Sequence, residues 1–245
     1  MNLDSGPSVT AQRVAAHRLT FTRPGWQHGD PAADDALAAD VAAGTEIAEG
    51  RMHDHLAART AFFDQAVLSA LAGGVRQVVT GAAGYDGRAL RFALPGLRWI
   101  EVDHPVTQRD KLARLDRLGI AAGHITFVPA DFTLDPLPGL LTGAGLNPAD
   151  PTVFLLEGVA VYLPADVLRL VLTSFAGLAA PGSTLAISMP VSGLVAGTAR
   201  FRDAVAALGE PVQTRFTPES ARSLLISSGW QPPDSSSGLI RAVRG

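Results

Sequence analysis

The chain has no cysteine, no long apolar run and no cluster of basic residues, and each absence removes a class of protein. Without cysteine it can form neither disulfides nor thiolate metal sites, which fits a cytoplasmic location. The N-terminal residues lack the apolar core of a signal peptide, and no apolar run is long enough to span a bilayer. The net charge is −3 and Lys and Arg are scattered, so neither nucleic acid nor an anionic membrane surface is an expected partner.

A metal site is not expected either. The only closely spaced histidines, His53 and His55, are two residues apart in a predicted helix and would point to nearly opposite sides of it. The HExxH pattern of a helical zinc site is also missing.

The composition that remains suits one α/β domain. The 245 residues are 47% apolar and 18% charged, which is enough to bury a substantial core. Short apolar runs alternate with helical patterns, and no hairpin signal separates them. This alternation predicts a parallel sheet with helices on both faces. The expected strands are 77–79, 97–102, 124–128, 152–156, 184–188 and 239–243, and the expected helices are 10–19, 32–43, 46–71, 88–92, 105–118, 166–178 and 217–228. Thr10 is the expected cap of the first helix, and 134–150 is expected to be a connection without regular structure.

The stretch 76–103 carries the strongest functional signal. A short β-branched strand runs directly into Gly81, Gly84 and Gly87, and a short helix and a second strand end at Asp103. An acid just beyond the second strand of such a unit binds the two hydroxyls of a ribose. The loop matches neither GxxxxGK[ST] nor a clean GxGxxG, so a pyrophosphate is not favoured. A ligand that contains adenosine but no pyrophosphate fits this pattern better, which indicates S-adenosylmethionine.

Two more acids follow strands at the same predicted edge of the sheet. Asp131 follows the strand 124–128 and precedes Phe132, so the pair could accept from an adenine amino group and pack on the base. Asp131 could equally cap a turn. Glu157 follows the strand 152–156 and suits the cationic methionine end. Arg59, in the preceding helix, is the expected partner of the methionine carboxylate.

The chain resembles the leucine carboxyl methyltransferase family of S-adenosylmethionine-dependent methyltransferases, including its bacterial polyketide O-methyltransferase branch. The matching stretches are TAQRVAAHRL, GDPAADDALA, ARTAFFDQAV, VVTGAAGYDGRALR, IEVDHPVTQRDKLARL and LLEGVAVYLPADVLRLVL. The resemblance implies a Rossmann-like class I methyltransferase sheet of seven strands with the last antiparallel. It also implies a helical segment 1–72 on the substrate side and a cofactor-binding domain 73–245 that together form one compact unit.

The resemblance also implies roles for particular residues. The expected contacts of S-adenosylmethionine, and of its product S-adenosylhomocysteine, are Arg59, Gly81, Gly84, Asp86, Asp103, His104, Asp131, Phe132, Glu157 and Gly158. Tyr162 and His28 are the candidates on the acceptor side, although Trp26 and His28 could simply belong to a loop pinned to the core. Thr80 stands where an acid is common in methyltransferases, and Ala82 stands at the first glycine of the turn.

The expected function is O-methylation of a carboxyl or hydroxyl group of a small molecule in specialised metabolism. The departures at Thr80 and Ala82 keep open a regulatory protein of the same fold that binds the cofactor without transfer. A nicotinamide-dependent oxidoreductase is a second alternative, which would need room for a pyrophosphate. Methylation of a protein carboxyl group, as in the eukaryotic branch, is a third.

Overall fold

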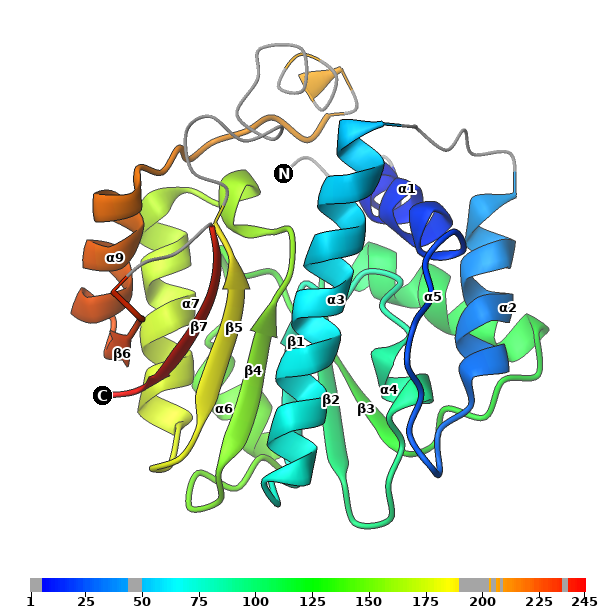
Figure 1. The fold of residues 1–245 in the computed structure, drawn as a ribbon, viewed down its shortest axis with the longest axis horizontal. Helices are drawn as coiled ribbons and strands as arrows, with labels where there is room; N and C mark the ends of the chain where they lie inside the picture. Colours follow the sequence, from blue (N-terminus) through cyan, green and yellow to red (C-terminus); the bar gives the residue numbers. More distant parts are fainter. Residues whose placement is uncertain (1–5, 44–49, 190–202, 204–205, 208, 235–237) are drawn as a thin grey trace.

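A seven-stranded sheet in the order β3-β2-β1-β4-β5-β7-β6 forms the centre of the protein (Figure 1). The computed structural model describes residues 6–43, 50–189, 203, 206–207, 209–234 and 238–245. The strands are β1 (Gln77–Gly81), β2 (Arg98–Asp103), β3 (Ile125–Pro129), β4 (Thr152–Leu156), β5 (Thr184–Ser188), β6 (Trp230–Gln231) and β7 (Leu239–Arg244). β1 to β5 pair in parallel, while β7 pairs antiparallel with both β5 and β6. The predicted mostly parallel sheet with an antiparallel last strand is confirmed.

Helices cover both faces of the sheet because successive strand residues point to opposite sides. In β1, Val79 belongs to a core shared with α6 (Leu137–Gly143), α7 (Ala165–Leu178) and α9 (Pro218–Ser227). Its neighbour Val78 belongs to a core on the other face. There the sheet packs against α1 (Val9–Arg18), α2 (Pro31–Ala42), α3 (Arg51–Ala72), α4 (Arg88–Arg91) and α5 (Pro105–Arg117). Figure 1 shows α3 crossing the near face of the sheet.

Most element boundaries agree with the sequence within one or two residues. The exception is α3, which begins at Arg51 after its N-cap Gly50, whereas the predicted helix is 46–71. Three local features also differ. Ser8 rather than Thr10 caps α1, its side chain accepting from the Ala11 N–H. The connection 134–150 contains the short helix α6. The two-residue strand β6 was not expected, and it takes the edge position beside β7. The stretch 189–208, whose later part the sequence also predicts to be helical, lies mostly outside the described residues. None of the described helices combines the length and the apolar character needed to cross a membrane.

Candidate functional site

The turn after β1 is tied to the end of β2 by Asp103. One carboxylate oxygen of Asp103 accepts from the Gly84 N–H at 2.5 Å, and the other accepts from the His104 N–H at 2.7 Å. Ala82 and Gly84 both have positive φ, of 51° and 52°. Ala82 is the one non-glycine residue with positive φ in the described chain, and such strain concentrates at functional sites. Burial raises the pKa of Asp103, and the two backbone N–H bonds oppose that rise without cancelling it.

A pocket of about 180 Å³ opens at this edge of the sheet. Its lining comes from the turn (Ala82), from the ends of β2 and β3 (Asp103, His104, Ala130, Asp131, Phe132, Thr133) and from the segment after β4 with one distant residue (Val159, Tyr162, Leu163, Pro164, Gln213). The structure therefore brings five of the predicted residues, Asp103, His104, Asp131, Phe132 and Tyr162, to one cavity.

Asp131 both caps a turn and lines the pocket. Its Oδ1 accepts from the Thr133 N–H at 2.8 Å and from the Thr133 hydroxyl at 2.7 Å. Burial raises the pKa of Asp131, but the Thr133 bonds and nearby His104 outweigh it and hold the pKa below its usual value. The carboxylate is therefore charged at neutral pH. Both readings of Asp131 from the sequence are compatible with this arrangement.

His104 serves as the cap of α5 with its ring. The Val106 N–H donates to His104 Nδ1 at 3.4 Å, so the neutral ring would carry its proton on Nε2. His104 is also one of the residues that line the pocket.

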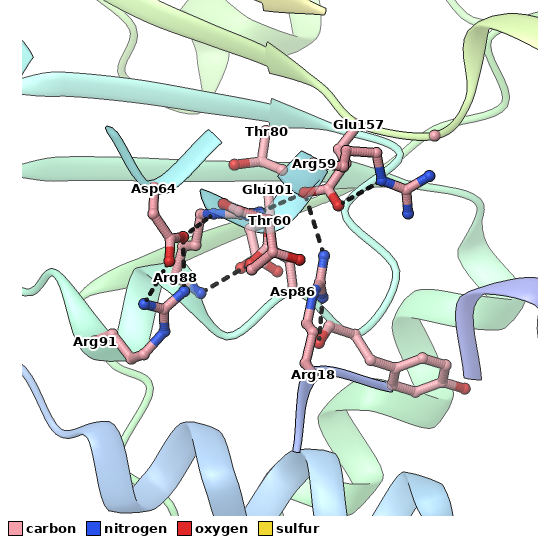
Figure 2. Close-up of polar contacts among 12 residues, drawn as sticks. Arg18, Arg59, Thr60, Asp64, Thr80, Asp86, Arg88, Arg91, Glu101 and Glu157 are labelled. Carbon is pink, nitrogen blue, oxygen red and sulfur yellow. Dashed lines mark hydrogen bonds and ion pairs between the residues drawn. The ribbon is translucent and has the colours of Figure 1, made fainter. Parts of the chain in front are cut away.

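Glu157 lies outside the pocket lining, within a buried ionic cluster (Figure 2). Its carboxylate pairs with three guanidinium groups: Arg88 at 2.6 Å, Arg59 at 3.0 Å and Arg18 at 3.3 Å. Burial pushes the pKa of Glu157 upward, yet Arg88, Arg18 and Arg59 outweigh it and lower the pKa to about 2. Three guanidinium groups already pair with this carboxylate and Glu157 does not line the pocket, so in this conformation it anchors Arg59.

Arg59 reaches the sheet edge from α3. Glu157 holds its Nε, and its two terminal nitrogens lie against Gly158, where an added Cβ would come within 3.2 to 3.4 Å of them. Gly158 has φ of 73°, a conformation that glycine adopts without strain. In the part of the chain that the structure describes, these terminal nitrogens keep their hydrogen-bonding capacity for another carboxylate.

Asp86 and Gly81 face the interior rather than the pocket. Asp86 is buried and accepts from the Arg88 N–H at 2.9 Å and from the Arg88 side chain at 2.7 Å. Gly81 is the last residue of β1, and an added Cβ would meet Leu156 at 2.8 Å and Phe132 at 3.3 Å. Both residues pack against the interior side of the glycine turn and do not line the pocket.

The two acceptor-side candidates lie in different surroundings. Tyr162 is buried in the 3-10 turn η1 (Ala160–Tyr162), and burial together with Glu210 raises the pKa of its phenol to about 12. His28 is exposed and does not line the pocket. The loop that carries His28 is attached to the core. Trp26 is partly buried, and its backbone N–H donates to the Arg91 carbonyl at 3.0 Å.

Three positions in and beside the glycine turn have a local explanation. Thr80 points to the α3 face and accepts from the Trp99 indole N–H at 3.1 Å, so it does not replace an acid in the pocket. Ala82 adopts the positive φ that a glycine would have adopted there. Gly87 has an ordinary φ of −102°, so its role is to provide space.

The space beside Gly87 is taken by Asp34 of α2. A Cβ at Gly87 would lie 1.7 Å from Asp34 Oδ1, and Asp34 is itself paired with Arg91 at 2.6 Å and Arg23 at 2.5 Å. We therefore expect Gly87→Ala to lower the free energy of unfolding by about 2 kcal/mol, as overpacking of a core does. Urea denaturation measures it. Gly177→Ala is the matched control, because Gly177 lies in helix α7 with nothing within 4 Å of the new Cβ. It should gain about 0.5–1 kcal/mol, and equal stability of the two variants would contradict the packing argument.

Two residues of the site carry no signal in the sequence. Gln213 lines the pocket from more than 50 residues beyond η1. Arg18 joins the Glu157 cluster from α1. Neither belongs to a strand end or a glycine turn, so only the tertiary fold reveals them.

The fold and the site together define a class. A sheet of this order, with a ligand pocket at the carboxyl ends of β1 to β3 and an acid after β2, is the Rossmann-like fold of S-adenosylmethionine-dependent methyltransferases. The model of the leucine carboxyl methyltransferase family matches residues 10–176, and the chain belongs to this family.

Relatives and solved structures agree with that assignment. A protein of Frankia alni, named provisionally as an S-adenosyl-L-methionine-dependent methyltransferase, is 39% identical over 177 residues, which cover 71% of this chain and 60% of the relative. The chain spans only about half of several other curated relatives, 47% of one from Mycolicibacterium paratuberculosis. A structure of a Streptomyces avermitilis protein of the DUF574 family has a TM-score of 0.64 at 14% identity, covering 99% of both chains. A structure of a Thermobifida fusca protein, named provisionally as a methyltransferase, has a TM-score of 0.63 at 17% identity and covers 98% of this chain and 96% of its own. At these identities the two structures support the fold alone.

Proposed function

We propose that the protein is an S-adenosylmethionine-dependent methyltransferase that acts on an oxygen of a small molecule. One observation carries this proposal: Asp103, Asp131 and Phe132 line a single pocket beside the glycine turn of a methyltransferase sheet. Family membership supports it independently. The acceptor group, a hydroxyl or a carboxyl, and a role in specialised metabolism remain part of the proposal.

The residues present fit the cofactor. Each oxygen of Asp103 accepts one backbone N–H and keeps lone-pair capacity for a ribose hydroxyl. Asp131 and the Phe132 ring would hold the adenine. Arg59 would bind the methionine carboxylate through its terminal nitrogens, with Gly84 and Gly158 leaving room for close approach of the backbone.

The reaction needs alignment more than acid–base chemistry. Bound S-adenosylmethionine supplies a methyl group on a sulfonium, open to in-line displacement by the acceptor oxygen. The pocket walls would hold that oxygen in line and exclude water. Tyr162, with its pKa near 12, stays a neutral phenol at physiological pH, so it can donate a hydrogen bond but is a poor base. A carboxylate acceptor would need no base, and the exposed His28 has no part in this scheme.

Titration calorimetry with S-adenosylhomocysteine tests cofactor binding. We expect one molecule bound per chain, and we expect NAD to give no heat because the glycine loop matches neither pyrophosphate-binding pattern. A chain that binds NAD and not S-adenosylhomocysteine would overturn the proposal in favour of an oxidoreductase.

Transfer itself is tested with S-adenosylmethionine carrying a labelled methyl group and a panel of phenols, alcohols and carboxylic acids. Label on an acceptor oxygen is the expected result. Tight cofactor binding without any labelled product from an extended panel would instead favour the regulatory alternative.

A further inference from the structure

The helix α1 lies directly across the glycine turn. A Cβ added at Gly84 would come within 3.1 Å of the Ala11 side chain. At the other end of α1, Arg18 donates to the Tyr85 carbonyl at 3.3 Å and pairs with Glu157 at 3.3 Å. α1 therefore covers the part of the site where the methionine portion of the cofactor would pass between Gly84 and Arg59.

The first turn of α1 is held by Glu210, a residue 200 positions away. Its carboxylate accepts from Ser8 Oγ at 3.0 Å, from the Val9 N–H at 2.9 Å, from the Thr10 N–H at 3.4 Å and from the Thr10 hydroxyl. Glu210 is only 3% exposed. A carboxylate at the N-terminus of a helix is stabilised by the unpaired N–H groups and by the helix dipole, so this contact is a firm attachment.

The segment that carries Glu210 is also fastened to the pocket wall. The Gln213 and Thr214 N–H groups donate to the Val161 carbonyl at 2.8 and 3.2 Å. The Gln213 side chain donates to the Tyr162 carbonyl at 3.2 Å, and the Thr214 hydroxyl donates to the Leu163 carbonyl at 2.6 Å. Glu210 thus connects α1 to a segment that is hydrogen-bonded to the pocket wall at 161–163.

The pocket is small for the ligand proposed. Its 180 Å³ lies below the roughly 300–1,000 Å³ common for small-molecule sites, and its lining includes Ala82 but not Gly84, which α1 covers. A nucleoside with a methionine tail would need room beyond this pocket, and on the Gly84 side that room is bounded by Ala11 of α1.

We propose that Glu210 is a positioning residue for the cofactor site: it latches α1 over the glycine turn, and release of this latch admits the cofactor. This inference rests on the proposed function. α1 acts as a lid that opens in a minor population, and the free energy of opening lowers the rate at which cofactor enters.

The first test compares Glu210→Gln with the wild type in stopped-flow binding of S-adenosylhomocysteine. Glutamine loses the charge that strengthens the four contacts, so the open fraction and the association rate constant should rise about tenfold. Glu219→Gln is the matched control, since Glu219 is exposed on α9. A purely structural role of Glu210 would weaken binding without accelerating association. An unchanged association rate would overturn the latch.

The second test uses the absence of cysteine from the chain, because a single introduced thiol is then the only one. Ala15 of α1 and Ala221 of α9 are both fully buried, so Ala15→Cys reports opening of α1 and Ala221→Cys is the control for global unfolding. Without ligand, the thiol at position 15 should react with a disulfide reagent at least about tenfold faster than that at 221, as local opening is less costly than global unfolding. Adding Glu210→Gln should accelerate only position 15.

These measurements separate the two proposals. Equal labelling at both positions, with wild-type binding of S-adenosylhomocysteine intact, would reject the latch and leave the proposed function standing. Rapid labelling at position 15 that S-adenosylhomocysteine never slows, together with no calorimetric binding, would reject the function instead.

Discussion

Arg88→Met is expected to lower the free energy of unfolding by about 3–5 kcal/mol, the cost of leaving buried charges without a partner. The Arg88 side chain is fully buried and pairs with Glu157 at 2.6 Å, Asp64 at 2.7 Å and Asp86 at 2.7 Å (Figure 2). It also donates to the Thr60 carbonyl at 3.1 Å. Methionine has a similar length but no charge, so three carboxylates would lose a shared cation. Urea denaturation is the suitable measurement, because guanidinium would screen the ion pairs.

The size of this loss should depend on pH in a defined direction. Pairing lowers the folded-state pKa of Glu157 to about 2 from an ordinary 4.5, and it lowers that of Asp86 as well. A group with a lowered pKa contributes stability above its unfolded pKa and loses that contribution as pH falls through its folded pKa. The difference between wild type and Arg88→Met should therefore be full near pH 7 and shrink between about pH 4.5 and 2.

Arg169→Met provides the control for this substitution. Arg169 is exposed on α7, where it donates to the Ser227 hydroxyl at 2.6 Å. Surface changes of this kind remain within about 0.5 kcal/mol. If Arg88→Met behaved like Arg169→Met, the buried cluster would not be a source of stability, and water or a shifted backbone would have to compensate the carboxylates.

Local signals in the sequence were sufficient for six of the seven strands of the sheet. β4 and β5 begin and end at the predicted residues, because β-branched and aromatic runs are bounded by clear breaks. α9 begins at Pro218 with Thr217 as its N-cap, within one residue of the predicted start. The short elements α6 and β6 were missed because seven and two residues carry too little periodicity to be recognised.

The site was predictable where a residue's place follows from topology alone. Asp103 and Asp131 follow strands that end at one edge, so parallel pairing of β2 with β3 brings them to one pocket. Glu157 follows the same rule and was expected to face the ligand, yet three arginines from α1, α3 and α4 take up its carboxylate. The position of these arginines depends on how helices that are far apart in the sequence pack together. No residue spacing in the chain predicts this packing.

The same limit applies to the glycines. The sequence places Gly87 among the glycines of the candidate cofactor loop, but this residue makes room for Asp34, which comes from a different helix. Thr80 looked like the loss of an acid, but it satisfies the buried N–H of Trp99 across the β1–β2 pair. In both cases the neighbour that explains the residue is brought there by tertiary packing.

Asp103→Ala is expected to weaken binding of S-adenosylhomocysteine by about 100-fold. In the proposed complex the carboxylate accepts from two ribose hydroxyls, and two hydrogen bonds to a charged group contribute about 3 kcal/mol together. The variant also frees the Gly84 and His104 N–H groups that Asp103 now accepts, so the glycine turn loses its tie to β2. Titration calorimetry gives the dissociation constant, and a thermal melt without ligand separates loss of the fold from loss of affinity.

A substitution in helix α5 provides the control, and a second ligand, adenosine, provides the decisive comparison. Asp116→Ala removes an exposed carboxylate from α5 and should leave both affinity and melting temperature unchanged. The discriminating quantity is the fold-loss of affinity for each of two ligands. Asp103→Ala should weaken binding of adenosine by the same factor as binding of S-adenosylhomocysteine, because the lost hydrogen bonds are to the ribose that both contain. If Asp103→Ala weakened S-adenosylhomocysteine but not adenosine, the acid would act through the glycine turn on the methionine end. The assignment of the ribose to Asp103 would then be wrong.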